Sequence, residues 1–123
     1  MKTMRFSDQD FKRFKKYVLK YVEVFGLVEW NLTVSHGQIG GNIVAQTQYN
    51  SVSKNASIRL TEQAEADYGV EDDVRRLALH EVLHLLVADF CETAAKLGDT
   101  HHELVVGAEH QLIARLMRGW GTW

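Results

Sequence analysis

The sequence predicts a small α+β domain with one helix, then three strands, then two helices. Apolar residues recur at helical spacing near the start of the chain, and short stretches alternate apolar with polar residues in its middle. The second half holds a long apolar stretch with acidic residues at its start, as a buried helix has. With 123 residues, 46% of them hydrophobic and 24% charged, residues 1–123 are expected to form a single domain.

The first predicted helix has clear signals at both ends. Ser7 and Asp10 form an acidic capping box, Phe6 and Phe11 stand where a hydrophobic staple requires them, and Gly26 ends the helix. The outer face carries basic side chains: Lys12, Arg13, Lys15, Lys16 and Lys20. Such a face can bind an acidic partner, but we interpret it as a solvated surface.

Three stretches have strand character, namely residues 30–34, 43–49 and 56–60. Their spacing predicts a small three-stranded, mostly antiparallel sheet. A helix that is apolar on nearly every side then runs from Val74 to Ala95 and ends at Gly98, so we expect it to be buried between the sheet and a last helix. The last helix begins at a second capping box, residues 100–103, and runs to about Arg118.

The buried helix contains the pattern H-E-x-x-H, from His80 through Glu81 to His84. Residues four apart lie one helical turn from each other, so both imidazoles can bind one metal ion. Glu81 then lies beside the metal, where it can accept a proton from metal-bound water. The alternative is a pair of hydrogen-bonded core histidines with a paired glutamate.

A catalytic zinc site needs a third protein ligand, which we expect on the last helix. Val87 and Phe90 stand where the metzincin extension of the motif needs glycine and histidine, so that subtype is excluded. The inward face of the last helix is predicted to comprise Val105, Leu112, Ile113, Leu116, Met117 and Trp120. Glu109 falls at the centre of this face, where a carboxylate must be paired or bound to metal. We predict metal ligation, and neutralisation by an arginine or histidine is the alternative.

Other polar residues of this region are weaker candidates. Glu103 and His110 lie at the edges of the apolar face, and His110 is the second candidate for the third ligand. His102 either lines the cleft and stabilises an oxyanion or is a partly exposed residue of the first turn. Cys91 is interpreted as a small buried hydrophobic residue.

The motif His80-Glu81-x-x-His84, followed by a glutamate on the next helix, resembles the gluzincin branch of the zincin metallopeptidases. The outline resembles the minimal single-domain members of that branch, which include peptidases encoded by phages and prophages. The resemblance implies His80, His84 and Glu109 as zinc ligands and Glu81 as general base. It also implies that an edge strand, here residues 43–49, binds an extended peptide.

Two departures from the gluzincin pattern affect these expectations. Many members carry an aspartate four residues after the glutamate ligand, but Ile113 stands there, so Asp89 or Asp99 is expected to support a histidine instead. The chain also lacks the extra subdomain with which larger members wall the cleft, which argues against activity on folded proteins.

The predicted function is therefore a zinc-dependent hydrolase, specifically a metallopeptidase that cleaves peptide bonds by Glu81-assisted attack of zinc-bound water. The alternative is a catalytically silent zincin-fold binding module with a structural metal or none. A net charge of -2 argues against nucleic acid as a partner, and no apolar run reaches the ~18 residues of a membrane span. The N-terminus lacks a signal sequence and the single cysteine fits a reducing compartment, so we expect a cytoplasmic protein.

Overall fold

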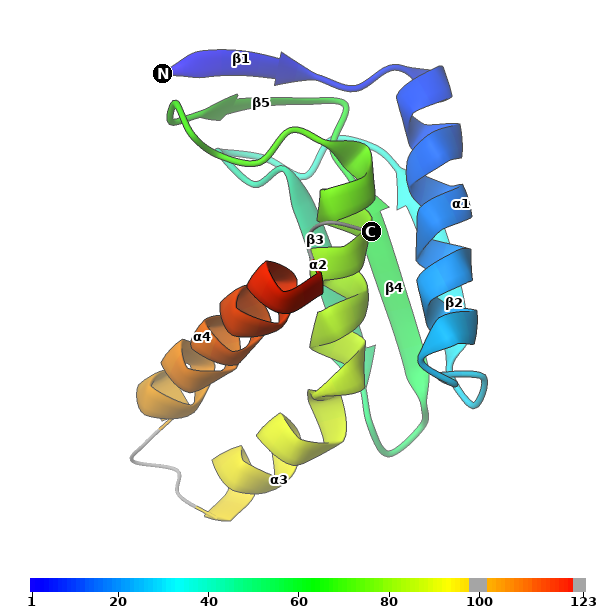
Figure 1. The fold of residues 1–123 in the computed structure, drawn as a ribbon, viewed down its shortest axis with the longest axis vertical. Helices are drawn as coiled ribbons and strands as arrows, with labels where there is room; N and C mark the ends of the chain where they lie inside the picture. The colour runs from blue at the N-terminus through cyan, green and yellow to red at the C-terminus, as the bar shows by residue number, and fades with distance from the viewer. Residues whose placement is uncertain (98–101, 121–123) are drawn as a thin grey trace.

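A computed structural model describes residues 1–97 and 102–120 of the chain, without the side chains of residues 93, 95–97, 102–105 and 120 (Figure 1). The described part is an α+β fold with four helices, one two-stranded sheet and one three-stranded sheet. The elements in chain order are β1 (Lys2–Arg5), α1 (Asp8–Val24), β2 (Asn31–His36), β3 (Ala45–Asn50), β4 (Asn55–Leu60), β5 (Gln63–Ala66), α2 (Val74–Leu86), α3 (Ala88–Leu97) and α4 (His102–Trp120).

The three-stranded sheet contains the three predicted strands in the order β2-β4-β3. β3 pairs antiparallel with β4, but β2 pairs parallel with β4, so the prediction of a mostly antiparallel sheet is right for only one of its two strand pairs. β4 takes the central place because it is the most apolar strand, with Ala56, Ile58 and Leu60 buried. β3 is consequently one edge of the sheet.

The smaller sheet was not predicted from the sequence. β1 pairs antiparallel with β5, from Lys2 opposite Ala66 to Arg5 opposite Gln63. The Thr3 hydroxyl donates to the Glu65 carboxylate at 2.8 Å across this pair. The sheet ties the start of the chain to the segment that leads into α2 (Figure 1).

Helix α1 begins and ends as predicted. The Ser7 hydroxyl accepts from the backbone N–H of Asp10 while the Asp10 carboxylate accepts from the backbone N–H of Ser7, which completes the capping box. Gly26 follows the helix with φ +68°, a conformation that glycine adopts without a steric cost. The face that packs on α2 buries Phe14 and Val18.

The predicted helix from Val74 to Ala95 is wrong in its continuity, because Val87 ends α2 and α3 then leaves at an angle (Figure 1). The acidic start is confirmed at Asp73, whose carboxylate accepts from the backbone N–H of Arg75. The predicted helix end at Gly98 and the capping box at residues 100–103 lie outside the described residues.

Helix α2 occupies the centre of the fold. It packs against α1 on one side and contacts β3 and α4 on others, which confirms that it is buried between the sheet and the last helix. Val82 and Leu83 of α2 are fully buried, together with Ile58 of β4. Within the described residues no helix combines the length and apolar character that crossing a membrane requires.

Candidate metal centre

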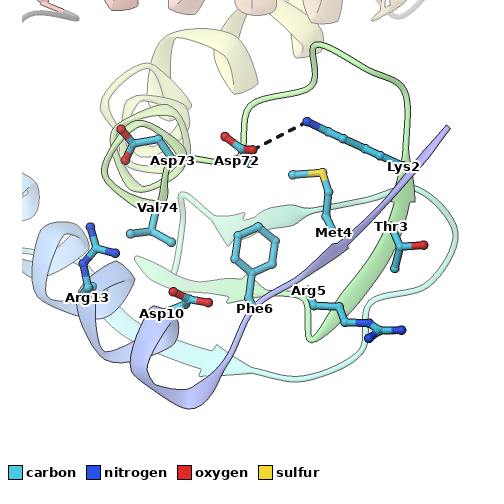
Figure 2. A pocket seen from close by; sticks show the side chains of 10 residues that line it. All are labelled: Lys2, Thr3, Met4, Arg5, Phe6, Asp10, Arg13, Asp72, Asp73 and Val74. Carbon is cyan, nitrogen blue, oxygen red and sulfur yellow. Dashed lines mark ion pairs between the residues drawn. The ribbon is translucent and has the colours of Figure 1, made fainter.

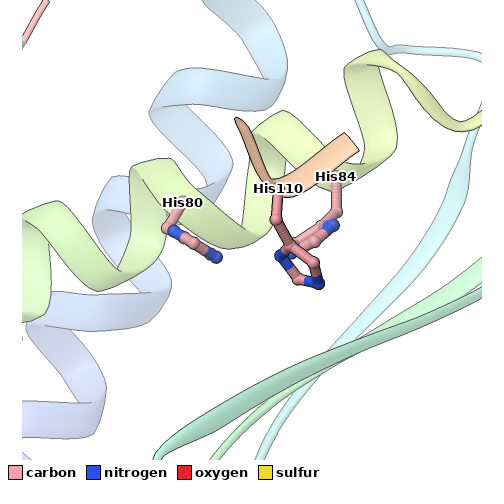
Figure 3. Close-up of side chains that lie close together, drawn as sticks. All are labelled: His80, His84 and His110. Carbon is pink, nitrogen blue, oxygen red and sulfur yellow. The ribbon is translucent and has the colours of Figure 1, made fainter. Parts of the chain in front are cut away.

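The two histidines of the motif lie one turn apart on α2, on the side that faces α4 (Figure 3). Their ring centroids are 5.1 Å apart and their planes are inclined by 65°. Both side chains are half-buried. The backbone of α2 thus holds two imidazoles next to each other before any ligand binds.

Helix α4 brings a third imidazole to this pair. The ring of His110 lies with its centroid 5.3 Å from that of His84 and 6.5 Å from that of His80 (Figure 3). One nitrogen from each of the three histidines lies within 4.8 Å of the others. Nitrogens bound to one tetrahedral zinc ion are about 3.3 Å apart, so small side-chain movements suffice to fit a metal ion.

Glu109, the predicted third ligand, lies beside the same group. Its Oε1 atom is 3.6 Å from Nδ1 of His84, and its side chain is only 11% exposed. No hydrogen bond reaches this buried oxygen from the residues that the structure describes. A buried carboxylate oxygen without a donor is costly, and a bound cation would remove that cost. Two helices therefore present four donor side chains: His80, His84, Glu109 and His110.

Burial keeps the motif histidines in the form that binds metals. Burial, together with the neighbouring His84 and His110, lowers the pKa of His80 to about 4. Burial also lowers the pKa of His84, while the nearby Glu109 carboxylate opposes this shift. Both imidazoles are therefore neutral at pH 7, as a metal ligand must be.

Glu81 is the most deeply buried charged residue of α2, with 5% of its surface exposed. Its Oε1 atom accepts a 2.8 Å hydrogen bond from the hydroxyl of Thr47 on β3. Burial raises the pKa of Glu81 to about 7, although the Thr47 hydrogen bond lowers it. A carboxyl with a pKa near neutrality is suited to accept and return a proton at physiological pH. Sequence reasoning missed Thr47, because nothing in its local pattern distinguishes it from other strand threonines.

A cavity of about 500 Å³ adjoins His80 and Glu81. Its walls come from the loop before β3 and the start of that strand, from the loop before α2, from the first half of α2 and from the end of α4. The apolar part of the wall comprises Ile43, Val44, Ala45, Val70, Leu77, Ala114 and Met117. Arg118 and the ion pair between Arg76 and Glu71, with Nε and Oε1 2.6 Å apart, supply charge at its border.

A second cavity, of about 490 Å³, lies away from the histidines between β1 and the first turns of α1 and α2 (Figure 2). Its walls carry both basic and acidic side chains, and Lys2 pairs with Asp72 at 3.7 Å. Asp10 and Asp73 are already bound to backbone N–H groups as helix-capping residues. This cavity therefore gathers no unsatisfied donor set of the kind found at the histidines.

Of the remaining predicted site residues, the structure describes Asp89 and Cys91. Asp89 is paired with Lys54, both carboxylate oxygens lying within 2.8 Å of Nζ, at the turn between β3 and β4. Cys91 is buried as predicted, and burial together with Glu109 raises the pKa of its thiol to about 11. Asp99 and the side chains of His102 and Glu103 lie outside the described residues.

The predicted inward face of α4 is confirmed at three positions and wrong at one. Ile113 and Met117 are buried and Leu116 is partly buried against the core, but Leu112 is 39% exposed. Val105 and Trp120 lie among the side chains that are not described. Glu109 still belongs to the buried side of α4, because Ile113 lies one turn after it on the same face.

The comparisons with known proteins identify no relative. No protein-family model matches the sequence, and no curated protein or solved structure matches it significantly.

Proposed function

We propose that this protein is a zinc-dependent hydrolase, specifically a metallopeptidase. The observation that carries the proposal is the convergence of three imidazoles from α2 and α4, the two of α2 half-buried, beside a buried glutamate. Three imidazole nitrogens within 4.8 Å of one another are a donor set that suits zinc.

His80 and His84 would hold the metal together with one side chain of α4, either Glu109 or His110. Bound zinc would act as a Lewis acid that polarises the substrate carbonyl and acidifies a water molecule. Glu81 accepts the proton of that water and later returns it to the leaving amine. Burial raises the pKa of the Glu81 carboxyl to about 7, so the group can accept a proton and release it again near neutral pH.

Two features next to the donor set support a peptide or protein substrate. β3 is an edge strand of the sheet and contacts α2, so its outer edge can pair with an extended peptide. The apolar cavity beside His80 and Glu81 can accommodate a hydrophobic side chain of that peptide. The zincin-type fold itself and its gluzincin ligand set remain part of this proposal.

One observation favours the alternative, a binding module with a structural metal. Glu109 and His110 both lie near His84, and four protein ligands would leave no open position for water. A structural site, however, needs no glutamate between its histidines. Glu81 is costly where it is buried, and this favours the hydrolase.

The proposal is tested by metal analysis followed by a search for hydrolysis. We expect about one zinc per chain after purification without chelator, and its loss in His80→Ala. Zinc-loaded protein should cleave members of a peptide library, and Glu81→Gln should keep its zinc but lose about 10²–10⁴-fold in rate. Equal rates in wild type and Glu81→Gln would exclude Glu81 as the base. Zinc bound tightly without any cleavage would favour the structural site.

A further inference from the structure

The strand next to the donor set places one hydroxyl against Glu81. Oγ1 of Thr47 lies 2.8 Å from Oε1 of Glu81 and 3.2 Å from the backbone carbonyl oxygen of the same residue. These contacts connect the middle of β3 to the centre of α2, across 34 positions of sequence. The general base of the proposed reaction therefore has a partner on a different element from the one that carries it.

The sheet fixes the position of this hydroxyl. Thr47 stands opposite Ile58 in the antiparallel pair of β3 and β4, so both side chains lie on the same face of the sheet. Ile58 is fully buried, which identifies this face as the one covered by the helices. A β-branched side chain in a strand also has few rotamers. Oγ1 is thus a donor whose position is set by the strand register.

The carboxylate of Glu81 depends on this donor. Among the described residues, the hydroxyl of Thr47 donates a hydrogen bond to this carboxylate. Glu81 itself is only 5% exposed. Water therefore has little access to this carboxylate and cannot readily take the place of the Thr47 hydroxyl if that hydrogen bond is lost. Valine has the same branched shape as threonine without the hydroxyl, so filling space at this position does not require a hydroxyl.

We propose that Thr47 is a positioning residue that holds Glu81 in the orientation needed for general-base catalysis. The inference rests on the proposed function. Thr47 donates to Oε1 and so leaves Oε2 as the oxygen that accepts the proton. When the O–H bond of water breaks and Oε2–H forms, the hydroxide bonds to the substrate carbonyl carbon, and Oε1 still accepts from Thr47. The carboxyl therefore need not rotate between taking the proton and passing it to the leaving amine.

The test compares Thr47→Val, which removes the hydroxyl, with Thr47→Ser, which restores it. Thr33→Val, at an exposed threonine of β2, is the matched control. The first measurement is the ¹³C resonance of the Glu81 side-chain carboxyl in metal-free protein, assigned by its absence in Glu81→Gln. We expect the resonance to move in Thr47→Val but not in Thr47→Ser or Thr33→Val.

The second measurement is steady-state hydrolysis by the zinc-loaded proteins. Misplacing a catalytic group by about 1 Å can cost ~10²-fold, so kcat of Thr47→Val should fall by about ten- to a hundredfold. KM should stay unchanged, because Thr47 acts on the base and not on the substrate. Thr47→Ser should recover most of the lost kcat. If Thr47→Val does not fold, Thr47→Ala takes its place with the same expectations.

The outcomes separate this inference from the proposed function. If wild type is active and Thr47→Val matches it in kcat and in the carboxyl resonance, the positioning role is wrong while the hydrolase stands. A loss of kcat that Thr47→Ser does not recover also overturns the role of the hydroxyl. If zinc-loaded wild type cleaves nothing, the proposed function fails, and a shifted resonance in Thr47→Val then shows a structural contact only.

Discussion

Helices α1 and α2 pack against each other but distribute their polar residues in opposite ways. α1 follows the usual partition, because Phe14 and Val18 face the core while its lysines and arginine are exposed. α2 breaks this rule. It places Glu81, with 5% exposure, and the side chain of His84, with 14% exposure, among buried aliphatic residues.

The comparison shows where the fold accepts an energetic cost. An amphipathic helix such as α1 gains stability from burial without burying any charge. α2 gains from its aliphatic residues but must desolvate three ionisable groups. Such a cost is typical of a site with a function, and on α2 it coincides with the donor set and the cavity. Substitutions on α1 should therefore change stability alone, whereas substitutions on α2 should change metal binding or the pH dependence of stability.

The largest expected effect on stability lies on α1. Phe14 is fully buried, so Phe14→Ala should lower the free energy of unfolding by about 3–5 kcal/mol. Folded Phe14→Ala should still bind as much zinc per chain as wild type, because Phe14 supplies no donor. Urea denaturation and metal analysis measure the two quantities. A loss of zinc from the folded variant would contradict the separation between the two helices.

On α2, removing a buried charge should stabilise the metal-free protein in a pH-dependent way. The pKa of Glu81 is raised from its ordinary value of 4.5 to about 7 in the folded protein. Between pH 4.5 and pH 7 the folded state therefore binds more protons than the unfolded state. Glu81 therefore lowers stability as pH rises from 4.5 through 7, by up to about 3 kcal/mol. Glu81→Gln lacks this loss and should exceed wild type most clearly at pH 8.

The histidines of α2 change stability in the opposite direction. Folding lowers the pKa of His80 from 6.5 to about 4, so between these pH values the unfolded state binds the proton and the folded state does not. The contribution of His80 to stability is therefore complete above pH 6.5 and is lost as pH falls toward 4. Both Glu81→Gln and wild type contain His80, so the difference between their unfolding free energies isolates Glu81. A difference that does not change between pH 4.5 and pH 8 would contradict the buried charge.

The third prediction concerns the α4 side of the donor set. If Glu109 is the third ligand, Glu109→Ala should weaken zinc binding by at least about tenfold, or 1.4 kcal/mol. His110→Ala should then retain near wild-type affinity. Competition titrations with a zinc chelator distinguish the two variants. The reverse result would establish a three-histidine site, and equal losses would indicate that both side chains bind the metal.

The smallest effect is expected on the outer face of α1. Lys16 is exposed, and Lys16→Ala should change the free energy of unfolding by less than about 0.5 kcal/mol. Zinc content and hydrolysis should stay at wild-type levels. A strong loss of hydrolysis with intact zinc would show that this basic face takes part in substrate binding, and it would join two regions that we treat as separate.

Local signals in the sequence were enough to predict α1, the positions of three strands and the burial of α2. The capping box at Ser7 and the i, i+4 histidines are short-range patterns, and the structure contains both in the expected form. β1 and β5 were missed because four-residue strands of mixed polarity carry almost no local signal. The break at Val87 was missed because neither glycine nor proline marks it.

The less predictable part of the candidate site depends on contacts between distant segments. Helical periodicity placed Glu109 at the centre of the inward face of the last helix, and the structure puts its Oε1 atom 3.6 Å from Nδ1 of His84. The same periodicity placed His110 at the edge of that face, although its ring lies close to both motif histidines. Side-chain reach across two helices depends on their crossing geometry, which no periodicity encodes. The partnership of Thr47 with Glu81 depends likewise on sheet register.

The pairing of β1 with β5 has a consequence for the order in which the fold assembles. Thr3 and Glu65 are 62 positions apart, so during synthesis β1 cannot pair until β5 has left the ribosome. Loop-closure entropy grows slowly with length, and this pair costs less than about 1 kcal/mol more to close than β2 with β4. The delay is therefore kinetic. We expect β1 to join last among the strands, after the hairpin of β3 and β4 has formed.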